Sequence, residues 1–292
     1  MAINKNSTGY TFAFSIIMVV IVGASLAFTS LSLKPRQKAN AADKQMVDIL
    51  GAIQVSSSRA TAKIDFQKFV TERVSIDYNG QVVNSKSGEV VATDATDPFN
   101  IDVKKDYRAN KPVKGDVSWG NASSLDFPLY VCEKEGEKLY VIPVVGSGLW
   151  GPIWGYVALK SDMETIYGVK FDHKTETPGL GAEIKEAGFQ VPFIGKKIFT
   201  ADGELKGVIA KKGGAAPDDP HGVDAISGGT ITSNGVNEMI YRTLKIYEPY
   251  FNNMKAGGTV EKVEEVIEEI VPDSTNLAMD SVVVDTAAAV EG

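Results

Sequence analysis

Uncharged hydrophobic residues dominate the start of the chain, where residues 11–33 form an uninterrupted run without a charge. At about 1.5 Å per residue, a helix of this length crosses a hydrocarbon core of about 30 Å. The apolar part of a cleaved signal peptide is shorter, at about 7–15 residues. The pattern therefore predicts that residues 1–38 form an uncleaved membrane anchor.

Apolar residues at helical spacing mark several later segments. They predict helices over residues 42–53, 59–72, 182–187 and 233–248. In the second of these helices, Ile64 and Phe66 belong to the predicted buried face. Pro249 lacks the N–H group that a helix interior needs, so we expect the last helix to end or kink there.

Short segments rich in β-branched and aromatic residues predict strands. These lie at residues 74–78, 81–84, 129–133, 138–145, 155–160, 168–172, 197–200 and 207–211. Asn79-Gly80 and Glu135-Gly136 are typical of hairpin turns, whereas residues 93–126 are mostly polar and predict a long surface loop. Because strands fill the middle and helices the two ends, we expect an α+β domain over residues 39–258 with a mainly antiparallel sheet.

A second uncharged run, residues 140–159, is also long enough to suggest a membrane span. Its Pro143 and Pro152 would each cost about 3 kcal/mol in a helix interior, and each of its four glycines about 1 kcal/mol. Two buried strands around a glycine-rich turn explain the composition better.

Charge is distributed unevenly along the chain. The net charge is -7, but residues 260–292 contain nine acidic side chains and a single lysine, so the remainder is close to neutral. We expect residues 259–292 to be an acidic, disordered tail, and nothing indicates nucleic-acid binding.

With Cys132 as the sole cysteine and two histidines, a Cys/His metal site is disfavoured.

Two familiar functional motifs are disfavoured because the segments around them lack the structure that each motif requires. Residues 146–151 match G-x-G-x-x-G after a strand, but Pro152 and a further strand follow where a dinucleotide-binding fold needs a helix. A structural turn is the better interpretation. A hydrolase that uses His221 with Ser227 or Thr230 is also disfavoured, because the G-x-S-x-G elbow is absent and we expect His221 in a solvated loop.

The stretch DAISGGTITSNG, residues 224–235, places adjacent glycines and several hydroxyl groups just before a predicted helix. Gly228 and Gly229 would let backbone N–H groups approach an anion, which the helix N-terminus favours. Ordinary helix capping explains the same residues. The residues alone leave both interpretations open. The stretch ETPGLG, residues 176–181, is a Pro-Gly turn that exposes Leu180. An ordinary type II turn before a helix explains it, although its glycines and proline would also let a planar ring lie against the backbone.

Three segments in order behind one span, IPVVGSGLWGPIWGYVAL, ETPGLGAEI and DAISGGTITSNGV, closely resemble the C-subunit family of Na+-translocating NADH:quinone oxidoreductases. The resemblance covers the anchor and residues 130–258. The related G-subunit family of the ion-pumping ferredoxin:NAD+ oxidoreductases has the same flavin-binding domain and is the alternative. A non-enzymatic, membrane-anchored module that binds a flavin or a free phosphate remains a third hypothesis.

The resemblance implies covalent FMN, joined by a flavin transferase through its phosphate to the hydroxyl of Thr230. The family motif places Asp224 in transferase recognition and Ser227, Gly228 and Gly229 beside the acceptor; Gly229 stands where the family usually has Ala. The implied flavin environment also includes Glu176, Thr177, Gly179, Leu180 and Gly181, and more loosely Leu149 and Trp150.

The resemblance also implies a place in the cell. The partners would be the other subunits of an NADH:quinone oxidoreductase that exports Na+, the flavin transferase and the lipid bilayer of the bacterial inner membrane. Lys34, Arg36 and Lys38 follow the span and Lys5 precedes it, which favours a cytoplasmic domain by the positive-inside rule. Because this bias is only two residues, we expect the orientation of the family, with the domain outside the cytoplasm.

Overall fold

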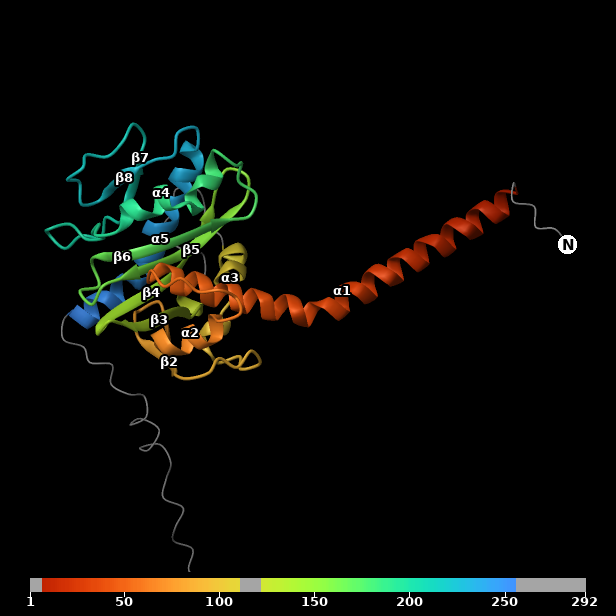
Figure 1. The fold of residues 1–292 in the computed structure, drawn as a ribbon, viewed down its shortest axis with the longest axis horizontal. Helices are drawn as coiled ribbons and strands as arrows, with labels where there is room; N and C mark the ends of the chain where they lie inside the picture. Colours follow the sequence, from red (N-terminus) through yellow and green to blue (C-terminus); the bar gives the residue numbers. More distant parts are fainter. Residues whose placement is uncertain (1–6, 111–121, 256–292) are drawn as a thin grey trace, which may run out of the picture.

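The computed structural model describes residues 7–110 and 122–255 of the chain. It shows an α+β domain from which one long helix, α1 (Thr8–Ala52), projects far beyond the rest of the molecule (Figure 1). The domain is built on a six-stranded antiparallel sheet, so the predicted fold class is confirmed.

The six strands lie in the order β2-β1-β3-β4-β5-β6. Their bounds are Val70–Ile76 (β1), Val82–Lys86 (β2), Phe127–Lys134 (β3), Glu137–Ser147 (β4), Pro152–Leu159 (β5) and Ile166–His173 (β6). A separate parallel pair joins β7 (Ile209–Lys211) to β8 (Gly222–Asp224). The segment predicted as a strand at 197–200 makes only isolated bridges at Lys197 and Phe199.

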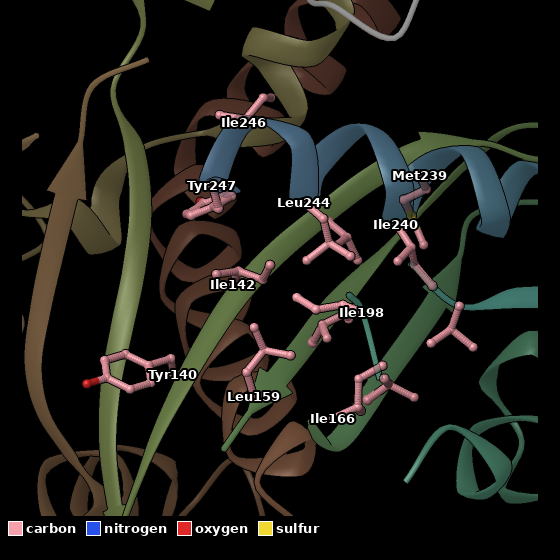
Figure 2. Packing of buried hydrophobic residues seen from close by; sticks show 14 of the residues in the cluster. Tyr140, Ile142, Leu159, Ile166, Ile198, Met239, Ile240, Leu244, Ile246 and Tyr247 are labelled. Atoms are coloured by element: carbon pink, nitrogen blue, oxygen red, sulfur yellow. The ribbon is translucent and has the colours of Figure 1, made fainter. Parts of the chain in front are cut away.

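Helices cover both faces of the large sheet. The long helix α5 (Thr230–Lys255) packs on one face, and Figure 2 shows Met239, Ile240 and Leu244 on this helix in the same hydrophobic cluster as Ile142 and Leu159 of the sheet. The last turns of α1 and helix α2 (Ala62–Phe69) cover the other face. Because both faces are buried, successive residues of β4 and β5 are apolar. This explains why residues 140–159 resemble a membrane span although they form two strands.

Shorter helices connect these layers. They are η1 (Pro98–Asn100), α3 (Val103–Ala109), η2 (Ala122–Ser124), η3 (Gly181–Lys185), α4 (Ala187–Gln190) and η4 (Val191–Phe193). The predicted loop at 93–126 therefore contains helices, although residues 111–121 lie outside the described part. The helix predicted at 182–187 is a 3-10 helix that begins at Gly181.

The anchor and the first helix of the domain form one element, not two. Pro35 lies inside α1, and the helix continues through it into the domain. A helical proline removes one hydrogen bond, whereas Ile49, Leu50 and Ala52 at the far end are fully buried. This packing holds the helix beyond the point where propensity alone would end it. The boundary predicted between the anchor and the domain, at residues 38 and 39, therefore falls inside α1.

Both predicted hairpins are present. Glu135 and Gly136 have positive φ angles of 55° and 78°, as a two-residue turn between β3 and β4 requires. The other hairpin turns at Gly80, where a side chain would meet the backbone nitrogen of Tyr250 at 2.3 Å. Helix α2 is shorter than predicted because β1 begins at Val70, and Ile64 is 71% exposed rather than buried.

Helix α5 is longer than predicted at both ends. It begins at Thr230 instead of Ser233 and passes through Pro249 to Lys255. The proline is tolerated because Tyr250 and Phe251, just beyond it, are buried in the core. The predicted acidic tail, residues 259–292, lies outside the described residues.

The N-terminal part of α1 is long and apolar enough to cross a membrane. Its most hydrophobic stretch has a mean hydropathy of 2.4, and no part of that stretch is buried against the domain. The helix therefore fits a single-pass anchor by length and composition.

Candidate functional site

Three segments far apart in the sequence meet around one pocket of about 230 Å³. They are the turn between β4 and β5, the loop after β6, and the first turn of α5. The walls are formed by Leu149, Trp150, Glu176, Thr177, Leu180, Gly181, Gly228, Gly229, Thr230, Ile231 and Thr232. The three stretches singled out in the sequence thus form one site.

One carboxylate joins the three segments. Glu176 is only 5% exposed, and its Oε1 accepts hydrogen bonds from the backbone N–H groups of Trp150 at 2.8 Å and Gly151 at 3.2 Å. Its Oε2 accepts a bond of 2.6 Å from the hydroxyl of Thr232 in α5. Hydrogen-bond donors from two other segments therefore balance the buried charge.

Two glycines leave room for this carboxylate. A Cβ atom on Gly148 would lie 2.6 Å from Glu176 Oε1, and one on Gly181 would lie 2.5 Å from both Glu176 Oε2 and Thr232 Oγ1. Both distances are shorter than real Cβ contacts. These positions require glycine because the acid packs directly against the backbone, not because of an unusual φ angle.

His173 supports the loop from the end of β6. Its Nδ1 accepts a hydrogen bond of 3.2 Å from the backbone N–H of Glu176, so the proton of the neutral ring lies on Nε2. Sequence reasoning missed this residue, because a histidine three positions before an acid carries no distinctive signal.

The acceptor predicted by the family motif lies at the start of α5. Thr230 is the first residue of the helix, is half-buried and lines the pocket. The first N–H groups of a helix have no partner within it and carry a partial positive charge. Ser233, predicted as the first residue of this helix, lies inside it, and its hydroxyl accepts a hydrogen bond from the N–H of Ile226.

Large apolar side chains are exposed around the pocket. Leu149, Trp150, Leu180 and Ile231 are 48%, 66%, 41% and 57% exposed, and all four line its walls. Ile231 was not among the predicted residues. A cluster of exposed apolar side chains at a concave site marks a surface that a ligand or partner covers.

Four other residues considered in the sequence do not line the pocket. Gly179 makes the turn, with φ of 75°, and donates to Glu183 Oε1 at 2.9 Å. Ser227 and Asp224 are both exposed, and Asp224 lies at the end of β8, where its carboxylate accepts a hydrogen bond of 2.8 Å from the Ala215 N–H. His221 is buried, not solvated, and its Nδ1 lies 2.7 Å from the carbonyl oxygen of Lys197.

Comparison with known proteins identifies the family. Residues 148–245 match the family model of the FMN-binding domain. The C subunit of the Na(+)-translocating NADH-quinone reductase of Neisseria meningitidis serogroup B is 33% identical over 254 residues, covering 84% of this chain and 92% of that protein. The chain belongs to the C-subunit family of these reductases.

Other members of the C-subunit family agree along most of their length. The Pasteurella multocida protein is 29% identical over 262 residues, covering 87% of this chain and 97% of that protein. The crystal structure of the Parabacteroides distasonis member has a TM-score of 0.62 at 35% identity, and covers 75% of this chain and 96% of that one. The predicted family is confirmed, and these relatives support it over the G-subunit alternative.

The pocket has the chemistry that FMN requires. The four exposed apolar side chains offer contact area for a flat ring, and the start of α5 supplies backbone donors for a phosphate. Thr230 brings a hydroxyl group to the same wall. The residues present therefore fit the cofactor of the family.

Proposed function

We propose that this chain carries FMN as a phosphoester on the Thr230 hydroxyl and acts as an electron-transfer subunit of a membrane NADH:quinone oxidoreductase that exports Na+. The proposal rests mainly on one observation. Thr230 lines the same pocket as residues of the other two motifs, at the N-terminus of a helix.

Each wall of the pocket has a separate role in this proposal. Backbone N–H groups at the start of α5 would hold the phosphate, since the helix dipole favours an anion there. Leu149, Trp150 and Leu180 would contact the ring and exclude water from it. Glu176 would act as a positioning residue, because its hydrogen bonds hold the β4–β5 turn against α5.

A covalent link keeps the cofactor on the protein whatever its charge. FMN, when bound, supplies redox chemistry that no side chain of the pocket offers. The protein contributes by fixing its position and by tuning it through packing and hydrogen bonds. Electrons would pass between neighbouring redox subunits, while NADH is oxidised and quinone reduced elsewhere in the complex.

Attachment needs a flavin transferase that reaches the segment before Thr230. Asp224 and Ser227 are both exposed on the approach to this residue, and so both offer surface for recognition by such an enzyme. Asp224 is held by its bond to Ala215 rather than by the pocket. Its role is in recognition, and the flavin would not contact it.

The orientation follows the family. We place the chain in the bacterial inner membrane as a single-pass protein, with α1 in the lipid bilayer and the domain outside the cytoplasm.

Replacing the acceptor tests the function directly. In the assembled complex, Thr230→Ala should abolish covalent flavin and NADH-to-quinone electron transfer, because no acceptor hydroxyl remains at that place. Asn234→Ala, an exposed position one turn later in α5, is the matched control and should retain both. A Thr230→Ala complex with wild-type electron transfer would refute the proposal.

A further inference from the structure

A second and larger groove, of about 940 Å³, lies beside the membrane end of the domain. Its longest wall is the segment of α1 from Pro35 to Asp48. Residues around the start of α2, the segment from 90 to 104, and strands β3, β4 and β5 form the other sides. Pro35 lies two residues after the uncharged run ends at Leu33. At about 1.5 Å per residue, Lys38 lies about 8 Å beyond that run, at the level of the lipid headgroups.

Four cationic side chains line the groove without an anionic partner. Lys38, Arg59, Lys63 and Lys104 are on its walls, and within residues 7–110 and 122–255 none of them forms an ion pair. A fifth cation, Lys44, is already neutralised by Asp48 at 2.8 Å and Asp172 at 2.9 Å. The groove therefore has more positive charge than its own acids balance.

Lys104 is the one of the four that lies over an aromatic ring of the groove. Its Nζ lies 3.5 Å from the ring centroid of Trp154, and burial lowers the pKa of its amine to about 8. The carboxylates of Asp48, Asp102 and Asp172 act on this ammonium group without forming an ion pair with it, so an anion that enters the groove would gain a charge-assisted contact with it.

One acidic residue of the same groove has an unpartnered oxygen. Asp43 lines the wall, makes no ion pair within the described part of the chain, and has an oxygen, Oδ1, buried there without a hydrogen-bond partner. Asp102, the remaining acid, is engaged at the start of α3, where it accepts from Lys105 N–H at 3.0 Å. Neither Asp43 nor Asp102 forms an ion pair in the described ranges, and the groove thus presents several unpaired cations together with the unpartnered carboxylate oxygen of Asp43.

Apolar side chains complete the lining. Phe99, Tyr130, Trp154 and Tyr156 lie on the walls between the charged groups. A ligand that matches this surface has an anionic group, a cationic group and apolar atoms. Because the groove lies beside the end of the membrane span, the ligand must also be present at the membrane surface.

We infer that the groove binds the headgroup of a zwitterionic phospholipid of the phosphatidylethanolamine type. The phosphate faces Lys104 and the neighbouring cations, the ammonium group faces Asp43, and the glycerol end points along α1 toward the bilayer. This inference uses the membrane anchor of the proposed function but does not depend on the flavin.

Native mass spectrometry of the full chain in detergent tests the inference, with dihexanoylphosphatidylethanolamine as the probe. One lipid should bind per chain, about tenfold more tightly than dihexanoylphosphatidylglycerol, which has the phosphate but lacks the ammonium group. Lys104→Met should weaken binding of both lipids by about tenfold, the effect of losing one charge-assisted contact. Asp43→Asn should remove the preference for the ethanolamine lipid.

Two further variants keep the test decisive. Lys63→Met changes an exposed side chain of the groove, so it should weaken binding even if Lys104→Met misfolds. Lys212→Met, exposed and outside the groove, should have no effect. Equal affinity for the two lipids, or affinities unchanged by Asp43→Asn, would overturn the inference. So would binding that appears only after residues 259–292 are deleted, since the acidic segment would then be the occupant.

Discussion

The hydroxyl of Thr232 donates a 2.6 Å hydrogen bond to the buried carboxylate of Glu176, 56 positions earlier in the chain. This bond connects the loop after β6 to the first turn of α5, where Thr230 lies. Two backbone N–H groups of the β4–β5 turn bind the other oxygen of the same acid. The geometry of the pocket therefore depends on Glu176 more than on any other side chain of the site.

Replacing this acid should loosen the pocket without removing the acceptor. Glu176→Gln puts an NH2 group where only donors face it, which should cost about 1–3 kcal/mol. We expect a melting temperature lower by about 2–4 °C per kcal/mol and reduced flavin attachment when the chain is coexpressed with a transferase. Glu186→Gln, an exposed acid of the same region, is the control. Wild-type melting and full attachment in Glu176→Gln would show that the acid does not organise the site.

The glycine beside the acid should be equally sensitive to a methyl group. Gly181→Ala would place a Cβ atom 2.5 Å from Glu176 Oε2, and such overpacking costs about 1–3 kcal/mol. At Gly188 a Cβ meets nothing within 4 Å, so Gly188→Ala should leave the melting temperature close to wild type. Thermal unfolding of the two variants decides the point, and similar melting temperatures would contradict the packing described around Glu176.

Much of this fold could be predicted from the sequence, because its signals are local. The Glu135-Gly136 turn, the apolar run through β4 and β5, and the helical spacing in α5 each depend on residues close in the chain. The three motifs could be grouped into one site only through the family resemblance. The Glu176–Thr232 bond and the supporting role of His173 depend on contacts between distant segments, which periodicity does not report.

The errors also have physical causes. Local patterns predicted separate helices before and after residues 34–41, and an end or kink at Pro249. Both helices instead continue past their prolines, and buried residues beyond Pro35 and Pro249 stabilise the continuation. Likewise, His221 lies in a polar stretch and was expected in solvent, yet the fold buries it against the backbone of Lys197. In each case tertiary packing outweighed a local preference.

Stability should depend on pH through Lys104. Burial lowers its pKa from 10.5 to about 8, so between these values the unfolded chain binds more protons than the folded chain, and stability rises with pH across that window. Lys104→Met removes this dependence. The difference in melting temperature between Lys104→Met and wild type should therefore change steadily as pH rises through the window, whereas Lys212→Met should follow wild type. A constant difference would contradict the lowered pKa of this amine.

Topology can be tested with a fusion. A reporter enzyme that is active only outside the cytoplasm, joined after Gly258, should be active, because we place the domain outside. The same fusion to a reporter that works only in the cytoplasm serves as the control and should be inactive. The opposite pattern would mean that the charges flanking residues 11–33 set the orientation.

Mass spectrometry of the peptide that contains Thr230 tests the central claim most directly. In wild-type chain coexpressed with a flavin transferase, this peptide should gain the mass of FMN less one water, with the fragment ions placing the adduct on Thr230. Thr230→Ala should carry no adduct, and Thr230→Ser should retain some, because its hydroxyl group survives. An unmodified wild-type peptide, or full modification of Thr232 or Ser233 in Thr230→Ala, would contradict the account.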